Sequence, residues 1–306
     1  IQSMREGQEQ VRREAQRLAT IEVVTVAQFA SEHLGNERPL HIFLPPHYRE
    51  TQTRYPVLYL NDGQDMGQLR LRETLARLTA HGRIQPLIVV AIPTTANRLQ
   101  EYGTAVAANA QGLGSQAAQY EDFVVKEIMP WINREFRTRT TARETAVLGA
   151  SLGGLAAFDL AWNHPDKFGA VGVFSGSFWW RAGDEETAVP SGRRIAHSQV
   201  RLAHSQVRLA HSQVRLAHSL VRQSRHHPGF RAWFQAGTRD ERSDRDNNGV
   251  IDAIQDTLEL MDELRALGLA DGRDLVYVEV ANGRHDYTTW SQVLPDFLIW
   301  AFPRFN

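Results

Sequence analysis

Apolar runs of strand length recur along the chain and are separated by stretches with helical spacing. Residues 87–92 form a continuous apolar run, as expected for a strand that is buried on both faces of a parallel sheet. In residues 120–136 the apolar side chains fall on one stripe of a helix, which Pro130 should bend or break. Strands that alternate with helices in this way predict an α/β fold with a mostly parallel central sheet. The other expected strands are residues 21–29, 39–44, 55–60, 145–148, 168–174, 232–235 and 275–280.

Composition and charge narrow the class of protein. The 306 residues include 42% hydrophobic residues, which can fill a core and exclude a disordered or fibrous chain. With 34 basic and 35 acidic residues the net charge is -1, so no basic field favours nucleic acid or an anionic membrane. No apolar run approaches the ~20 residues that span a bilayer. The chain has no cysteine, which excludes disulfides, thiolate metal sites and a cysteine nucleophile.

The chain opens with a polar segment. Residues 4–18 are rich in Arg, Glu and Gln and contain few apolar positions, which predicts an exposed N-terminal helix. The first residues do not form a basic and apolar leader, so we expect no signal peptide and a cytoplasmic location.

A sharp strand-to-helix turn is predicted around Ser151. Residues 149–153 are Gly-Ala-Ser-Leu-Gly, the one G-x-S-x-G pattern in the chain, between the expected strand 145–148 and a helix that starts at Leu152. This is the context in which the pattern presents a serine nucleophile. The start of the helix also aims N–H groups and the positive end of its dipole at the place where an oxyanion would form. The alternative is a glycine-rich turn with a structural role only.

A nucleophilic serine needs a base, and α/β-hydrolases supply the acid and then the base after the serine along the chain. Of the twelve histidines, only His285 follows a late strand in a glycine-containing loop, so we expect it to be the general base. Asp240 is the first carboxylate after the strand 232–235 and is the expected acid, with Glu241 as the second choice. The alternatives are a surface histidine and a solvated loop charge or helix cap.

Several further segments carry a resemblance to one known family. They are residues 55–64 (Tyr-Pro-Val-Leu-Tyr-Leu-Asn-Asp-Gly-Gln), 149–154, 164–165 (His-Pro), 168–171 (Phe-Gly-Ala-Val), 175–180 (Ser-Gly-Ser-Phe-Trp-Trp), 237–238 before Asp240, and Gly283 before His285. Together these segments resemble the esterase family of the α/β-hydrolase superfamily that includes enterochelin esterase-like hydrolases, feruloyl and acetylxylan esterases and esterase D. The similarity covers about residues 38–303 apart from a repeat described below.

The resemblance implies an α/β-hydrolase fold and a set of site residues. The second oxyanion donor should come from the loop after the strand 55–60, so the N–H of Gln64 would act with that of Leu152, with Gly63 and Asp65 as the alternatives. Arg98, Glu101 and Tyr102 fall where relatives approach the substrate. Trp179 and Trp180 could line the acyl or alcohol pocket, with the core as the alternative.

Residues 244–252 match the first nine positions of an EF-hand-type calcium loop. Oxygen ligands are expected from Asp244, Asp246, Asn248, Val250 and Asp252, with Gly249 at the sixth position. The pattern departs at position twelve, where Gln255 replaces the bidentate glutamate and Asp256 follows one residue late. The alternative is a polar turn that caps a helix from Ala253. A bound calcium ion would have a structural role, stiffening the loop that carries Asp240, and we expect no cofactor to be required.

Four near-identical heptads of the type Arg-Leu-Ala-His-Ser-Gln-Val fill residues 194–221. On a helix the Val, Ala, Gln and Leu positions share one arc and the Arg, Ser and His positions share the other, so the segment predicts an inserted long helix of ~42 Å that projects from the body. The last copy, in which Leu220 replaces Gln, is expected to pack on the body, with the copy of Ile195 as a second candidate.

The other heptads are expected to need a partner. Their exposed apolar face would be costly alone, which predicts a helix from another copy of the protein and hence a homo-oligomer formed through residues 194–221. The four histidines of the repeat lie ~10 Å apart along the helix, too far to share one metal ion.

Together these features predict a serine carboxyl-ester hydrolase that acts on a small-molecule ester through an acyl-enzyme. We expect an N-terminal helix over residues 1–20 and an α/β-hydrolase catalytic domain over residues 21–306, with residues 194–221 as a helical insertion. The alternatives are an acyltransferase of the same fold, and an interaction protein that assembles through the repeat.

Overall fold

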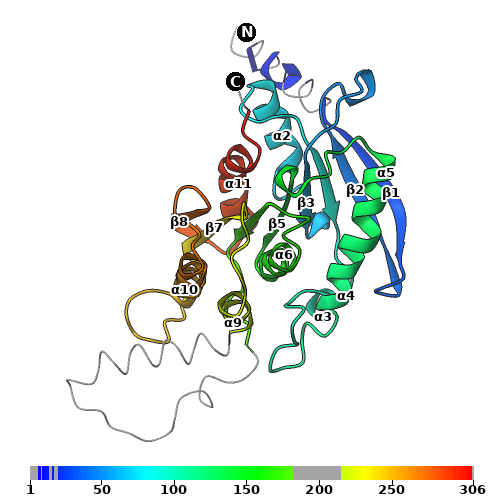
Figure 1. Ribbon diagram of the computed structural model, residues 1–306. Coiled ribbons are helices and arrows are strands. Elements are labelled where there is room, and N and C mark those ends of the chain that lie inside the picture. Colours follow the sequence, from blue (N-terminus) through cyan, green and yellow to red (C-terminus); the bar gives the residue numbers. More distant parts are fainter. Residues whose placement is uncertain (1–5, 8, 14–15, 17–19, 182–214, 305–306) are drawn as a thin grey trace, which may run out of the picture.

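Eight strands of the described residues form one sheet in the order β1-β2-β4-β3-β5-β6-β7-β8 (Figure 1). The computed structural model describes residues 6–7, 9–13, 16, 20–181 and 215–304. β2 pairs antiparallel with β1 and β4, and the sheet is parallel from β4 to β8. The strands are β1 (Glu22–Ser31), β2 (Asn36–Leu44), β3 (Val57–Asn61), β4 (Ile88–Ile92), β5 (Thr145–Ala150), β6 (Ala170–Phe174), β7 (Arg231–Arg239) and β8 (Leu275–Arg284). The predicted mostly parallel sheet and all eight expected strands are confirmed.

Helices cover both faces of this sheet because its side chains alternate between two apolar cores. In β3, Val57 and Tyr59 join one core and Leu58 and Leu60 the other. The first core packs against α4 (Ala117–Asp122), η3 (Phe123–Ile128), α5 (Met129–Glu135), α6 (Leu152–Asn163), α9 (Leu216–Arg222) and α10 (Asp252–Ala266). The second packs against α2 (Leu71–Ala80) and α11 (Tyr287–Ala301). The remaining short helices are η1 (Tyr48–Glu50), η2 (Gly63–Asp65), α3 (Arg98–Glu101) and η4 (Ala142–Glu144).

The helix expected over residues 120–136 is present and begins earlier, as consecutive α4, η3 and α5. Pro130 lies in the first turn of α5, directly after the π-helical η3. Proline has no N–H and its ring collides with the carbonyl of the preceding turn. The wider π-helical turns make room for the ring, so the helix continues past the proline instead of breaking.

The structure differs from the sequence expectation at the repeat. Of the four heptads, the described residues include the last one, which packs on the body as expected and forms α9. Arg215, however, has an extended backbone (φ -75°, ψ 116°) and pairs with Arg181, so α9 begins at Leu216 and no continuous helix passes through residue 215. Arg215 and His218 are also fully buried, although we expected both on the solvent arc. Residues 194–214 lie outside the described residues.

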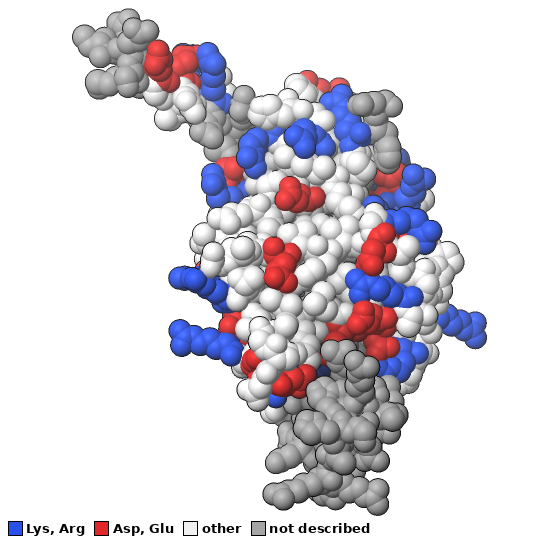
Figure 2. All heavy atoms as spheres, turned by 90° about the vertical axis from the view of Figure 1, so that its left-hand side faces the viewer, with Lys and Arg blue, Asp and Glu red and all other residues white. Residues whose placement is uncertain are grey.

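At the N-terminus, residues 6–7, 9–13 and 16 are helical and exposed. No helix among the described residues is long and apolar enough to cross a membrane. On the face shown in Figure 2, basic and acidic side chains are interspersed, in keeping with the balanced charge of the chain.

Candidate active site

Ser151 occupies the tight turn between β5 and α6. Its backbone has φ 57° and ψ -128°, a strained conformation for a residue with a side chain. The turn requires glycine on either side, because a Cβ on Gly149 would lie 2.0 Å from the carbonyl oxygen of Gly153. The strand and the helix therefore approach closely and leave the Ser151 side chain at the carboxyl end of the parallel strands.

The structure brings His285 to this serine from a position 134 residues later in the chain. Ser151 Oγ and His285 Nε2 are hydrogen-bonded at 2.8 Å. The imidazole also packs edge-on against the ring of Trp290, with ring centroids 5.2 Å apart. Partial burial lowers the pKa of His285 below its ordinary value; the carboxylates of Asp240 and Asp286 oppose this shift and the Arg98 guanidinium adds to it. A neutral imidazole at neutral pH is the form that can accept the serine proton.

Asp240 lies at the end of β7, next to the end of β8 that leads to His285. Its Oδ2 accepts a hydrogen bond from the Gly237 N–H at 3.0 Å, and its buried Oδ1 has no hydrogen-bond partner. Burial raises the pKa of this carboxyl, against the opposing effects of Gly237, the Ser175 hydroxyl and His285. The Asp240 charge favours the protonated form of His285, and no hydrogen bond joins these two side chains in the described part of the chain.

Glu241 has a different environment. Burial raises the pKa of its carboxyl, with a hydrogen bond from the Ala253 N–H opposing the shift and the carboxylates of Asp252, Asp256 and Asp240 adding to it. Asp240, unlike Glu241, is among the main influences on the pKa of His285. Of the two candidate acids, the electrostatics therefore favour Asp240 as the partner of the imidazole.

The two expected oxyanion donors, the N–H groups of Leu152 and Gln64, come from different elements. Leu152 is the first residue of α6, where an N–H has no partner within the helix. Gln64 lies in η2, which follows β3 and is entered through Asp62 with φ 57°. Asn61 joins the two elements, because its Nδ2 donates to the carbonyl of Gly153 at 2.8 Å. The loop of Gln64 and the start of α6 are therefore held in a common frame.

Arg98 binds the loop that carries Gln64 through an ion pair with Asp62. Its Nε and Nη2 donate to the two carboxylate oxygens of Asp62 at 2.7 and 2.9 Å, and its side chain is 32% exposed. The Asp62 N–H in turn donates to Tyr102 Oη at 3.0 Å. The charge of Arg98 also contributes to lowering the pKa of His285.

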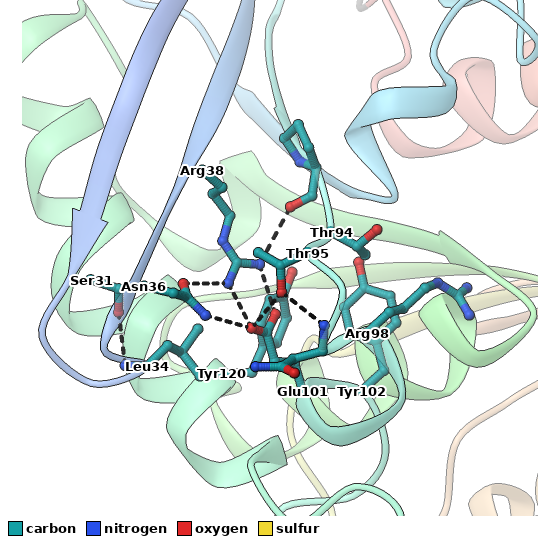
Figure 3. A network of polar contacts seen from close by, with 12 residues as sticks. Ser31, Leu34, Asn36, Arg38, Thr94, Thr95, Arg98, Glu101, Tyr102 and Tyr120 are labelled. Atoms are coloured by element: carbon teal, nitrogen blue, oxygen red, sulfur yellow. Dashed lines mark hydrogen bonds and ion pairs between the residues drawn. The ribbon is translucent and has the colours of Figure 1, made fainter.

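A network of buried polar side chains fixes α3, the helix of Arg98, to β2 (Figure 3). Both oxygens of Glu101 accept hydrogen bonds from Arg38, each at 2.8 Å, and the pair is almost completely excluded from solvent. Asn36 and Thr95 add hydrogen bonds of 2.9 and 3.2 Å to the same carboxylate. Glu101 therefore anchors α3 and does not approach substrate.

Two of the residues expected to touch substrate have another role. Tyr102 is 0% exposed and orients Asp62 through its hydroxyl, and Trp180 is 1% exposed and packs beside Gly103 and Gly114. Tyr102, expected where relatives approach substrate, and Trp180, expected in the pocket or alternatively in the core, are both enclosed by the core. Trp179, on the segment that follows β6, is 47% exposed to solvent.

The sequence analysis missed two residues that support His285. Trp290 Nε1 donates to Ser175 Oγ at 2.9 Å, so the indole that packs on the imidazole is itself fixed. Ser175 has φ 47° and, like Asp62 and Ser151, is one of the strained residues around the site. Ser175 belongs to the resembling segment 175–180, but its contact with Trp290 joins two positions that are distant in the chain.

The hydrogen bonds within residues 244–255 show how far this loop matches a calcium site. Both oxygens of Asp244 accept loop N–H groups, at 3.1 and 2.9 Å, as the first residue of such a loop does. At position twelve, however, both ends of the Gln255 side chain are engaged within the loop. Its amide nitrogen donates to Asp246 at 2.5 Å and its Oε1 accepts from Asn248 Nδ2 at 2.8 Å. Arg245 is paired with Asp252 and Asp256. No cluster of three or more metal-ligating side chains occurs in the described part of the chain, and the residues at hand do not complete the site.

Comparisons with solved structures show the fold. A ferulic acid esterase has a TM-score of 0.63 at 19% identity, over 94% of this chain and 99% of that chain. The ferric enterobactin esterase of Salmonella typhimurium has a TM-score of 0.63 at 23% identity, over 93% of this chain and 60% of that chain. The chain therefore has the α/β-hydrolase fold that the sequence predicted.

Sequence relatives point to the same group of proteins. The uncharacterised protein YbbA of Bacillus subtilis is 28% identical over 165 residues, covering 53% of this chain and 65% of YbbA. The iron(III) enterobactin esterase of Escherichia coli K12 is 32% identical over 161 residues, covering 51% of this chain and 37% of that protein. The matched segments span less than two thirds of either relative. A family model matches residues 31–301, and since this is most of the chain, the protein belongs to the family described as "Putative esterase".

Proposed function

We propose that this protein is a serine carboxyl-ester hydrolase. The observation that carries the proposal is the 2.8 Å hydrogen bond between His285 Nε2 and the Oγ of Ser151, a residue with a strained backbone. A serine held in this way, next to an imidazole whose pKa is lowered, is activated for attack on a carbonyl carbon. Membership of the esterase family supports the same reaction class.

The first half-reaction forms an acyl-enzyme. Ser151 Oγ attacks the ester carbonyl carbon while its proton passes to His285 Nε2, and the N–H groups of Leu152 and Gln64 stabilise the oxyanion. When the carbonyl re-forms, the C–O bond to the alcohol breaks and His285 returns the proton to the leaving oxygen. Asp240 stabilises the imidazolium by its charge, which favours the protonated form of His285.

The second half-reaction releases the acid. Water gives a proton to His285 and adds its oxygen to the acyl carbon. When the second tetrahedral intermediate collapses, the C–O bond to Ser151 breaks and His285 returns the proton to Ser151 Oγ. An alcohol in place of water would make the protein an acyltransferase. Product analysis with an added alcohol separates the two, because a transferase forms the new ester in preference to the free acid.

The substrate proposed is a small-molecule ester with an aromatic part. The supporting observations are the exposed ring of Trp179 and the partly exposed guanidinium of Arg98, which can stack on or hydrogen-bond to such a group. Similar proteins are named feruloyl esterase and enterobactin esterase. A panel of short acyl, feruloyl and siderophore lactone esters tests this class.

Replacement of the nucleophile tests the mechanism. We expect Ser151→Ala to lower kcat on 4-nitrophenyl acetate by about 10³-fold or more at an unchanged Tm. A fluorophosphonate should add one covalent adduct to the natural chain and none to Ser151→Ala. Ser243→Ala, an exposed serine in the loop after β7, is the matched control and should keep both activity and labelling. Full activity of Ser151→Ala would refute the proposal.

We also propose that the repeat supports self-association, because heptads beyond the docked one would expose an apolar face if helical. Light scattering of the natural chain and of a variant lacking residues 194–214 tests this. The natural chain should be oligomeric and the shortened chain monomeric, while equal masses would refute self-association through the repeat.

A further inference from the structure

The last heptad is held on the body by a specific set of polar contacts with α10. The Arg215 guanidinium, fully buried, is bound by the carboxylates of Asp256 and Glu259. His218 Nε2 donates to the backbone carbonyl of Asp256 at 2.8 Å. Arg222 Nε, one heptad after Arg215, donates to Glu263 at 3.1 Å. Three basic side chains at spacings of three and four residues are thus matched to successive turns of α10.

The apolar side of α9 completes this fit. Leu216, Ala217 and Val221 are buried in the core that also contains α6 and α10. The start of the helix is fixed as well, since the Leu216 N–H donates to the carbonyl of Trp180 at 2.9 Å. The docking surface formed by Trp180, α6 and α10 therefore selects the pattern Arg-Leu-Ala-His-x-x-Val-Arg.

The preceding heptads carry the Arg, Ala, His and Val positions of that pattern. The arginines recur at residues 194, 201 and 208, the histidines at 197, 204 and 211, the alanines at 196, 203 and 210, and the valines at 200, 207 and 214. Each valine is again followed by an arginine, and the Leu216 position is Ile in the first copy and Leu in the others. The residues that correspond to Arg215, His218 and Arg222 in the other three heptads could therefore make the same polar contacts.

We propose that the docking surface on α10 accepts any of the four heptads of its own chain, so that the protein exchanges among four registers spaced by seven residues. In the observed register 33 residues separate Arg181 from the docked arginine. The other three registers leave 26, 19 and 12 residues, and even the shortest exceeds the two to five residues of a tight hairpin loop. The chain closes in every register.

The same chain is the favoured source of the competing heptads. A tethered segment is present at an effective concentration of the order of mM, well above that of a segment on another molecule in dilute solution. Exchange in cis also keeps the site intact, because the contact of the docked helix with Trp180, next to Trp179, is made by the backbone at the second residue of any heptad.

Two contacts outside the shared pattern favour the observed register. Leu220 packs against the core, whereas the other heptads have Gln at this position. Ser224 Oγ accepts a hydrogen bond from Trp162 Nε1 at 2.9 Å, whereas the equivalent residue after each other heptad is Ala. The docked copy is therefore the major state and the other registers are minor states that a ligand or mutation can populate.

The test disables the docked heptad with and without competitors. Arg215→Ala with His218→Ala is introduced into the natural chain and into a blocked chain, in which the arginines at 194, 201 and 208 and the histidines at 197, 204 and 211 are all alanine. The blocked chain keeps its length and its docked copy, so it should fold. We expect the loss of Tm in the natural chain to be less than half of that in the blocked chain. Equal losses would overturn the proposal.

Two further measurements sharpen the result. Glu259→Lys alters the surface that all heptads share, so it should lower the Tm equally in both backgrounds; a smaller loss in the natural chain would contradict the proposed docking surface. The rescue should also persist when the protein is diluted 100-fold. A rescue that disappears on dilution would mean that the replacing heptad comes from another molecule and would overturn exchange in cis.

Discussion

Arg98 and Asp62 form a two-point ion pair at 2.7 and 2.9 Å that ties helix α3 to the loop of Gln64. Asp62 sits at φ 57° directly before η2, so the direction in which this loop leaves β3 depends on how Asp62 is held. Beneath the pair, Arg38 and Glu101 fix α3 to the antiparallel edge of the sheet. The ion pair thus connects the buried core to the proposed oxyanion donor.

Breaking this ion pair should slow catalysis. Asn tolerates the left-handed backbone, so Asp62→Asn removes the charge without new strain. We expect kcat/KM to fall about 10–100-fold in Asp62→Asn and in Arg98→Gln, because a displacement of about 1 Å has costs of this size. The double variant should be no slower than either single variant. Glu22→Gln, in an exposed pair with Arg49, is the control; additive losses in the double variant would contradict the coupling.

The pH dependence of kcat/KM should report His285. Protonated imidazole cannot act as the base, so activity falls as the pH drops through the pKa of His285, which lies below the ordinary value of about 6.5. The rate should therefore be near its plateau at pH 7. Since the Arg98 charge adds to the lowering, Arg98→Gln should move the acid limb to higher pH. A limb centred above pH 7 in the natural protein would contradict this assignment.

Replacement of each candidate acid decides between them. Asp240→Asn removes the charge that faces His285, and we expect kcat to fall about 10³-fold or more, as for other triads that lose the acid. Glu241→Gln leaves the surroundings of His285 unchanged and should alter kcat less than about twofold. Rates are measured on one aryl ester at pH 8, where the imidazole is neutral. The reverse ranking would assign the acid to Glu241.

The buried pair of Arg38 and Glu101 should matter for stability. Glu101→Gln leaves the guanidinium in the core without its counter-charge, which we expect to cost about 3 kcal/mol or more of unfolding free energy. Replacement of both residues, as Arg38→Met with Glu101→Leu, should cost less than the single change. Urea denaturation measures both values. A larger loss in the double variant would show that the pair itself stabilises the fold.

Calcium should distinguish the natural loop from a completed one. Gln255 donates to Asp246, so we expect added calcium to leave the Tm of the natural chain unchanged. Gln255→Glu supplies the missing bidentate ligand, and calcium at 100 times its Kd should then stabilise the fold by about 2.7 kcal/mol. Thermal unfolding with calcium and with a chelator measures both. An equal response of the two chains would show that Gln255 does not limit binding.

Local pattern was sufficient for the strands, the turn at Ser151 and the choice of His285. A strand buried on both faces must be apolar, and a nucleophile on a strained turn must have glycine around it, so both leave marks within a few residues. The order of acid and base along the chain then pointed to Asp240 and His285. His285 is hydrogen-bonded to Ser151, and the charge of Asp240 influences the pKa of His285.

Burial and pairing between distant segments depended on the tertiary structure. Tyr102 and Trp180 are residue types that often line pockets, yet the packing of other elements buries them. The helical arc assigned Arg215 and His218 to solvent because periodicity records polarity and not the neighbour; the carboxylates and the carbonyl of α10 make their burial favourable. The sequence pattern shows which apolar residues can be buried without a partner. Polar residues are buried only where the fold brings charged or hydrogen-bonding partners to them.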